Sequence, residues 1–259
     1  FQSYGEGFPF FNTLKVSIYT KYFTLPLFLY VHRQLTLESP ILNLKVLKNK
    51  EFTVGTILVM LDFAIILSAM YLMPQYIQNG VGIAVALTGV IMLPGGVINA
   101  VTSAIAGRLY DNIGARRPAI LGFIIAFIGA VMLAMASDTA SIVYIIAAHV
   151  ILMIGAPLAM SPAQTSALNS LSGREAGDGS TILNTMQQVV GALATAFATS
   201  FLELGRGAAT GSAAARFTAG SHTGFYFTIA LIVVAFIVSF QLKDRQRGHS
   251  IKLDESAKN

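Results

Sequence analysis

Six apolar runs, each long enough to cross a membrane, constrain this chain more than any other feature of its sequence. The runs lie near 53–75, 88–107, 118–136, 140–160, 180–202 and 223–242. A helix needs about 20 apolar residues to span the roughly 30 Å hydrocarbon core of a bilayer. Only short connections separate most of these runs, which favours antiparallel packing of neighbouring helices. The sequence therefore predicts an all-α integral membrane protein with a six-span bundle at 53–242.

The composition excludes other broad classes of protein. Hydrophobic residues make up 54% of the chain and charged residues 11%, whereas soluble domains carry about 25% charged residues. The formal net charge of +5 is spread over the segments between apolar runs, so we expect the lipid bilayer as a partner and no nucleic acid. The chain has no cysteine, which excludes a disulfide framework, a thiolate metal site and a cysteine nucleophile.

The first 52 residues are harder to interpret. A seventh span is possible at 12–31, but Lys15 and Lys21 interrupt it, and an interfacial segment is the alternative. The residues at 38–51 mix apolar and basic side chains, which favours a position along the cytoplasmic interface. Phe1 is not an initiator methionine and no basic segment precedes an apolar core, so we expect no signal peptide and a chain that begins inside a longer one.

Lysine and arginine are distributed unevenly between the two ends of the predicted spans. The end expected to be cytoplasmic carries thirteen: Arg33, Lys45, Lys48, Lys50, Arg108, Arg116, Arg117, Arg174, Lys243, Arg245, Arg247, Lys252 and Lys258. The opposite end carries Arg206 and Arg216, and Lys15 and Lys21 are assigned to neither end. Basic residues concentrate on the cytoplasmic side of membrane proteins. We therefore expect a multi-pass protein with its tail, 243–259, in the cytoplasm and a mobile external connection at 203–222.

One short stretch, GRLYDNIGARR at 107–117, has a specific pattern of glycine, acidic and basic residues. Glycine permits a tight turn and close approach of helices, and a basic pair anchors a cytoplasmic connection. The residues of this expected cytoplasmic signature loop are Gly107, Arg108, Asp111, Gly114, Arg116 and Arg117.

This stretch resembles the G-x-x-x-D-[RK]-x-G-x-[RK]-[RK] loop of the major facilitator superfamily, with Asn112 where the pattern prefers a base. With Pro74, Gln78 and Leu93-Pro94-Gly95, the chain is similar to the C-terminal half of the fourteen-span drug:proton antiporters of the EmrB/QacA type. The resemblance implies that 53–242 is the second six-helix bundle and 12–31 a linker helix. It also implies an N-terminal transporter half as partner, the plasma membrane as location, lipophilic or cationic substrates, and a proton gradient in place of a cofactor.

Two titratable side chains lie at membrane depth. Asp62 is about nine residues into its span and is surrounded by apolar residues, an environment in which desolvation favours reversible protonation. We expect it to carry the proton or to pair with a cationic substrate, although hydrogen bonding to another helix is an alternative. His149 is a second candidate for the same coupling, or an ordinary packing residue.

Uncharged polar residues are the candidates for a substrate cavity. They are Tyr71, Gln75, Asn99, Asn184, Gln187 and Gln188. Such side chains equally hold helices together by hydrogen bonds.

The sequence contains no metalloprotease, hydrolase or nucleotide-loop motif and no clustered metal ligands, so we expect neither an enzyme nor a metal site. The leading interpretation is one half of a secondary transporter, which needs two bundles for alternating access. A truncated, non-transporting fragment, or a half completed by a separately encoded partner, is the alternative.

Overall fold

The computed structural model describes residues 26, 29, 33 and 42–243. The elements in order are η1 (Leu44–Lys48), α2 (Lys50–Gln75), η2 (Tyr76–Gly80), α3 (Val85–Ile113), α4 (Arg116–Ala134), α5 (Ile142–Asn169), α6 (Arg174–Ala208) and α7 (Ala213–Ser239). The chain divides into two compact units, Phe1–Val46 and Leu47–Asn259, and the six long helices belong to the second. The possible linker helix at 12–31 lies almost entirely outside the described residues, as does the tail from residue 244.

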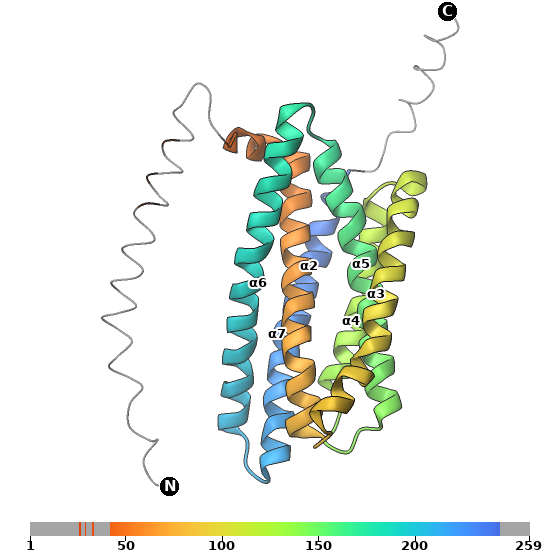
Figure 1. The fold of residues 1–259 in the computed structure, drawn as a ribbon, viewed down its shortest axis with the longest axis vertical. Helices are drawn as coiled ribbons and strands as arrows, with labels where there is room; N and C mark the ends of the chain where they lie inside the picture. The colour runs from red at the N-terminus through yellow and green to blue at the C-terminus, as the bar shows by residue number, and fades with distance from the viewer. Residues whose placement is uncertain (1–25, 27–28, 30–32, 34–41, 244–259) are drawn as a thin grey trace, which may run out of the picture. The chain divides into compact units, whose positions relative to one another are not determined.

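The six long helices of the second unit are the six predicted spans. Each is long and apolar enough to cross a membrane, and the described residues contain no strand. Successive helices run antiparallel, so the starts of α2, α4 and α6 share one end of the bundle with the ends of α3, α5 and α7 (Figure 1). The prediction of an all-α membrane bundle is therefore confirmed.

The connection expected at 203–222 is mostly helical. α6 continues to Ala208 and α7 begins at Ala213. A Cβ on Gly205 would lie 2.9 Å from the carbonyl oxygen of Ala219, so the two helices approach closely there. The prediction of a mobile loop was wrong, because these small residues allow close helix packing as readily as they allow flexibility.

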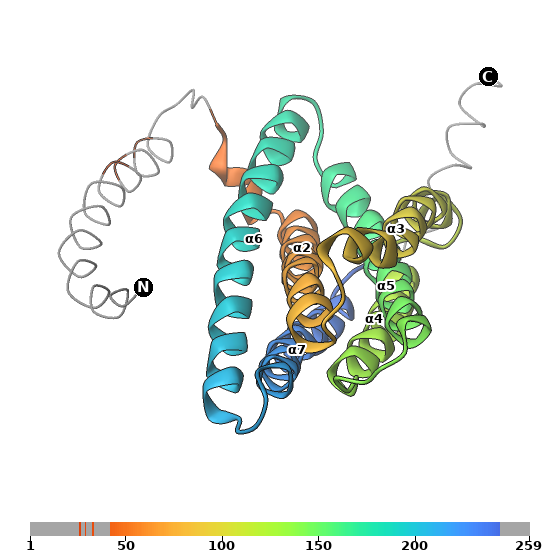
Figure 2. The same ribbon diagram turned by 60° about the horizontal axis from the view of Figure 1, so that its bottom comes forward.

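Helix α2 lies in the middle of this unit. It packs against α5, α6 and α7, while α4 packs against α5 and α7, and α3 packs mainly against α5 (Figure 2). Small residues allow the close contact of α4 with α5. A Cβ on Gly122 would lie 2.6 Å both from the backbone nitrogen of Ala159 and from the carbonyl oxygen of Gly155. Dense packing of this kind replaces the hydrophobic effect as the force between helices in lipid.

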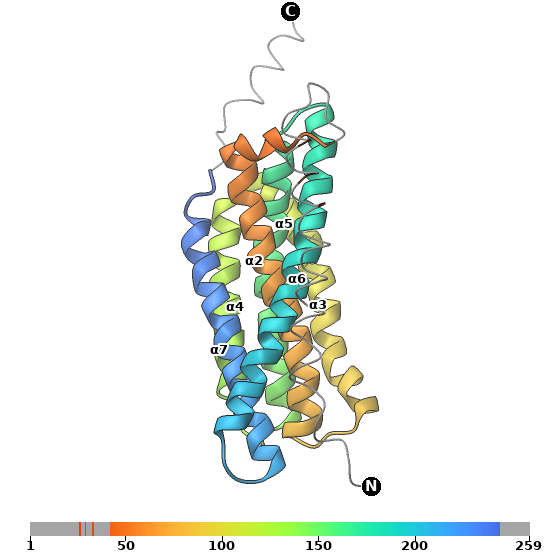
Figure 3. The ribbon, with the colours of Figure 1, turned by 90° about the vertical axis from the view of Figure 1, so that its left-hand side faces the viewer.

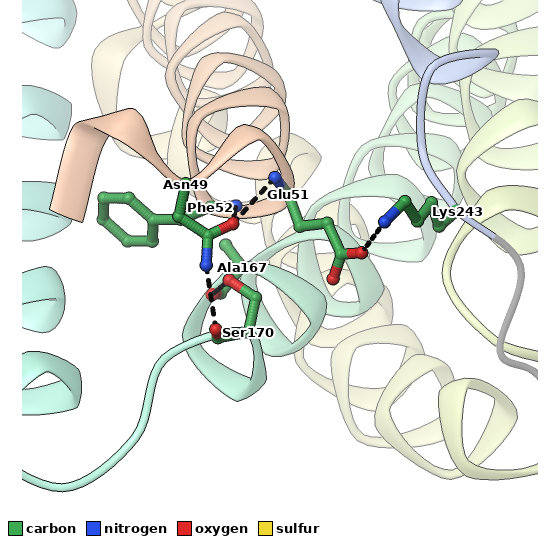
Figure 4. Close-up of polar contacts among 6 residues, drawn as sticks. All are labelled: Asn49, Glu51, Phe52, Ala167, Ser170 and Lys243. Atoms are coloured by element: carbon green, nitrogen blue, oxygen red, sulfur yellow. Dashed lines mark hydrogen bonds and ion pairs between the residues drawn. The ribbon is translucent and has the colours of Figure 1, made fainter.

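Polar contacts join three elements at the end of the bundle where α2 begins (Figure 4). The Oδ1 atom of Asn49 accepts a hydrogen bond of 3.0 Å from the backbone N–H of Glu51 and so caps α2. The Nδ2 atom of Asn49 donates to the carbonyl oxygen of Ser170, 2.9 Å away, just after α5. Glu51 forms an ion pair with Lys243, which follows α7. The last residues of the expected interfacial segment, 38–51, thus form the cap and first turn of α2.

Basic residues gather at this same end. Those described in the second unit are Lys48, Lys50, Arg108, Arg116, Arg117, Arg174 and Lys243, all at or near helix termini there. Arg206 and Arg216 lie near the α6–α7 connection at the opposite end. The unequal distribution expected from the sequence is therefore present in the fold, and its assignment to the cytoplasm stays a prediction.

Candidate functional site

Asp62 is the most unusual side chain in the bundle. It lies within α2 and is 0% exposed. Within the part of the chain that the structure describes, neither carboxylate oxygen has a hydrogen-bond partner. An ionised carboxylate in such surroundings costs several kcal/mol. A buried acid without a partner in a membrane span is therefore a candidate for reversible binding of a proton or cation.

The neighbouring helix that Asp62 faces follows from the register between α2 and α5. A Cβ on Gly55 would lie 2.7 Å from the Cβ of Ala167, so this side of α2 meets α5. Asp62 comes seven residues after Gly55, close to two full helical turns, and therefore lies on the same side. Because the helices are antiparallel, Asp62 reaches the level of about Met160 in α5.

A cavity of about 400 Å³ opens beside this level between α2, α3 and α5. Its lining is Ile66, Asn99, Ser103, Pro157, Met160, Ser161, Gln164, Thr165, Leu168 and Asn169. Ile66 is one turn from Asp62, so the inner end of the cavity adjoins the part of α2 that carries the buried acid. Along α5 the lining extends from Pro157 to Asn169, about 18 Å, and Asn169 is exposed at the helix end. None of the lining residues is charged.

His149 lies apart from Asp62. Its side chain is 3% exposed, its two ring nitrogens have no hydrogen-bond partner among the described residues, and its ring packs against Gly95 of α3. From His149 to the level of Asp62 along α5 is about eleven residues, or about 16 Å. The two coupling candidates from the sequence are therefore not brought together.

Of the six predicted cavity residues, only Asn99 lines the cavity just described, where its Nδ2 atom lies 3.5 Å from the Sδ atom of Met153. Gln75 instead accepts a hydrogen bond of 3.0 Å from Asn79, and Tyr71 is half-buried elsewhere on α2. On α6, Gln187 is buried, while Asn184 and Gln188 are exposed. These five residues do not line this cavity, because helical side chains of similar polarity point in different directions, and their place in a substrate site stays a prediction.

The sequence reasoning missed most of the polar lining. Ser161, Gln164 and Thr165 follow the expected end of their span at residue 160, but α5 continues to Asn169. Their spacing of three and four residues places them on one face of this helix. That spacing is the signal that was available in the sequence.

The expected signature loop is largely helical. α3 continues to Ile113 and α4 begins at Arg116, so only two residues separate the helices. Gly114 has a φ of +79°, which explains the glycine at this turn. A Cβ on Gly107 would lie 3.9 Å from the Oγ atom of Ser161, an ordinary contact. Arg108, Asp111 and Arg117 are exposed. Gly107 is therefore not required for close approach, contrary to expectation.

The described residues contain no group of three or more histidine and acidic residues able to hold a metal ion. In the part of the chain that the structure describes, the candidate site thus consists of one buried acid and an uncharged polar cavity. Such an arrangement can hold a small molecule in the cavity and a proton on the acid.

Comparison with known proteins matches residues 31–195 to the model of the Major Facilitator Superfamily. The lincomycin resistance protein of Listeria monocytogenes is 39% identical over 251 residues, which are 94% of this chain and 53% of the relative. The lincomycin resistance protein of Bacillus subtilis is 33% identical over 258 residues, which are 96% and 54% of the two chains. The multidrug export protein of Escherichia coli is 27% identical over 120 residues, 46% and 23% of the two chains.

The chain spans about half the length of the curated relatives it matches over most of its length. The names of these relatives describe resistance and export, which agrees with a transporter and not an enzyme.

Proposed function

This chain belongs to the Major Facilitator Superfamily, and from that premise we propose that it forms one half of a proton-coupled exporter of lipophilic or cationic compounds. The partner in this proposal is a first bundle, because transporters of this architecture move one helical bundle against another around a site at the bilayer midplane. The resistance and export proteins among its relatives support export as the direction of transport.

The observation that carries the proposal is the state of Asp62, fully buried and without a hydrogen-bond partner among the described residues. A group used only for packing gains by forming a hydrogen bond, because an unsatisfied buried polar group costs about 1–3 kcal/mol. A group that exchanges its proton or pairs with a passing cation must remain available. We assign this coupling role to Asp62.

The cavity beside Asp62 supports a role in substrate binding. Its uncharged lining joins amide and hydroxyl groups such as Gln164 and Ser161 with apolar groups such as Ile66. Sites for small molecules combine apolar walls with a few polar groups that fix orientation. In the proposed transporter, Asp62 supplies the charge that the cavity lining lacks.

The test joins this chain to the part of the Listeria monocytogenes relative that it does not match. The joined protein, the chain alone and the intact relative are expressed in an efflux-deficient bacterium, and export of ethidium is followed by fluorescence. We expect efflux by the joined protein that an uncoupler abolishes. Efflux insensitive to the uncoupler would contradict proton coupling. Absence of efflux, with the intact relative active and the joined protein present in the membrane, would contradict the transport proposal.

A further inference from the structure

The face of the bundle formed by α4 and α7 carries a second, apolar pocket. The two helices lie side by side (Figure 3). The pocket has a volume of about 240 Å³ and is lined by Phe123, Ile124, Phe127, Ile128, Ile232, Val233 and Phe236. Phe123 and Ile232 are 1% exposed and form its floor, whereas Phe127 and Val233 are about two-fifths exposed. We call this feature the α4–α7 groove.

The groove faces outward because both helices use other sides for packing. In α4, a Cβ on Gly129 would lie 2.8 Å from the Cα atom of Leu152, so its small-residue side contacts α5. In α7, Thr228 forms a hydrogen bond of 2.9 Å with Ser68 of α2. The large apolar side chains of the α4–α7 groove are thus left toward the surroundings of the bundle, which in a membrane are lipid chains.

One end of the groove is basic. Arg116 comes seven residues before Phe123, so it lies on the same side of α4 and about 10 Å farther along the helix. Its guanidinium carbon lies 5.9 Å from the centroid of the Phe240 ring. Phe240 contacts Phe236 of the groove edge to face, with 5.1 Å between ring centroids. Arg117, the next residue, is exposed. The α4–α7 groove therefore ends near the guanidinium group of Arg116, and Arg117 is exposed beside it in sequence.

The dimensions match one leaflet of a bilayer. From Arg116 to Ile128 is twelve residues, or about 18 Å of helix, and one leaflet contributes about 15 Å of hydrocarbon. Arginine binds phosphate through paired hydrogen bonds. We propose that the α4–α7 groove binds one acyl chain of an anionic phospholipid from the leaflet at the α4 start, with its phosphate at Arg116 and Arg117.

Charge distinguishes this occupant from a second copy of the chain. A copy packed on the groove by two-fold symmetry would place the same basic end against a protein surface. A phospholipid instead offers an apolar chain along the groove and a negative group at its basic end. A single phospholipid molecule then matches both the apolar lining of the α4–α7 groove and its basic end.

The test uses the full chain, purified and delipidated in a neutral detergent. Binding of long-chain phosphatidylglycerol and of phosphatidylcholine with the same acyl chains is measured by native mass spectrometry and by the shift in thermal unfolding. We expect about ten-fold tighter binding of phosphatidylglycerol, because both lipids carry the phosphate but the choline cation of phosphatidylcholine opposes the charges of Arg116 and Arg117. The double variant Arg116→Gln/Arg117→Gln should lose this preference. Arg108→Gln, which removes a charge from α3 at the same end of the bundle, should keep it.

A further variant tests the groove itself. Val233→Trp fills the groove without changing charge, so it should weaken binding of both lipids while leaving the unfolding temperature of the lipid-free chain nearly unchanged. Equal binding of the two lipids by the unaltered chain would overturn the proposal. So would a preference for phosphatidylglycerol that survives the arginine substitutions, or a dimer, seen by sedimentation, that Val233→Trp dissociates.

Discussion

Gly95 of α3 lies against the imidazole ring of His149 of α5, and a methyl group at position 95 would overlap that ring. His149 therefore occupies space that only a glycine on α3 leaves open. Apart from its chain neighbours and the backbone of its own helix, the next residue, Gly96, has no atom within 4 Å of the place where its Cβ would be. These adjacent glycines make a matched pair for measuring how firmly α3 is held on α5.

We expect Gly95→Ala to lower the free energy of unfolding by about 1–3 kcal/mol, the usual cost of overpacking. Gly96→Ala should change it by less than about 0.5 kcal/mol. Thermal or denaturant unfolding of the full chain in detergent measures both. In the double variant Gly95→Ala/His149→Ala the overlap is gone, so the two effects should not add. If the changes in the free energy of unfolding from the two single substitutions add exactly in the double variant, the His149 ring is not what makes a larger residue at position 95 unfavourable.

Hydropathy predicted the six spans because a bilayer imposes one minimum length on each helix. It did not predict their ends, since α6 continues beyond its apolar run in both directions, from Arg174 to Ala208. A helix that leaves the hydrocarbon has no need to stay apolar. Polar residues after residue 160, among them Gln164, therefore looked like a connection although they lie on α5.

The candidate site was predictable only in part. The place of Asp62 in the middle of an apolar run indicated burial, and the structure confirms that burial. Its distance from His149 depends on the direction and register of α5 against α2, which no local pattern contains. For the same reason the sequence did not separate Asn99, which lines the cavity, from Asn184, which is exposed on α6.

The orientation in the membrane can be tested with single cysteines, because the chain has none of its own. Ser172 and Thr210 are exposed and lie in the short connections after α5 and after α6, at opposite ends of the bundle. We expect an impermeant maleimide to label Thr210→Cys on intact cells and Ser172→Cys only after permeabilisation, because basic residues gather at the end that carries Ser172. The reverse labelling pattern would place the C-terminal tail outside.

The cavity predicts a specific effect on substrate affinity. Gln164 is half-buried in its lining, whereas Gln241 is exposed just after α7. In the joined transporter, Gln164→Ala should raise the KM for an exported substrate about five-fold, which corresponds to the loss of one hydrogen bond. Gln241→Ala should leave the KM unchanged. Equal KM values for the two variants would show that the cavity does not contact that substrate.

The last prediction concerns Asp62 in the joined transporter. Asp62→Asn preserves size and removes titration, so expression should remain normal while efflux of a cationic dye falls at least ten-fold and loses its dependence on pH. Thr56→Val serves as the control, because Thr56 lies on the same helix, is 3% exposed and also has a hydroxyl without a partner among the described residues. It should leave the pH profile unchanged.

A packing role for Asp62 predicts a different outcome. If its neutral carboxyl group serves only to fill space, the amide of Asp62→Asn imitates it and efflux remains near the unaltered level, with its pH dependence intact. Asp62→Leu then retains efflux as well, since an apolar side chain of similar size leaves no unsatisfied group in the same position. If Asp62 carries the proton, Asp62→Leu and Asp62→Asn both abolish coupled efflux, and Asp62→Glu, which restores a titrating group, recovers part of it. If only Asp62→Glu recovers efflux, transport requires the charge of this side chain and not its volume.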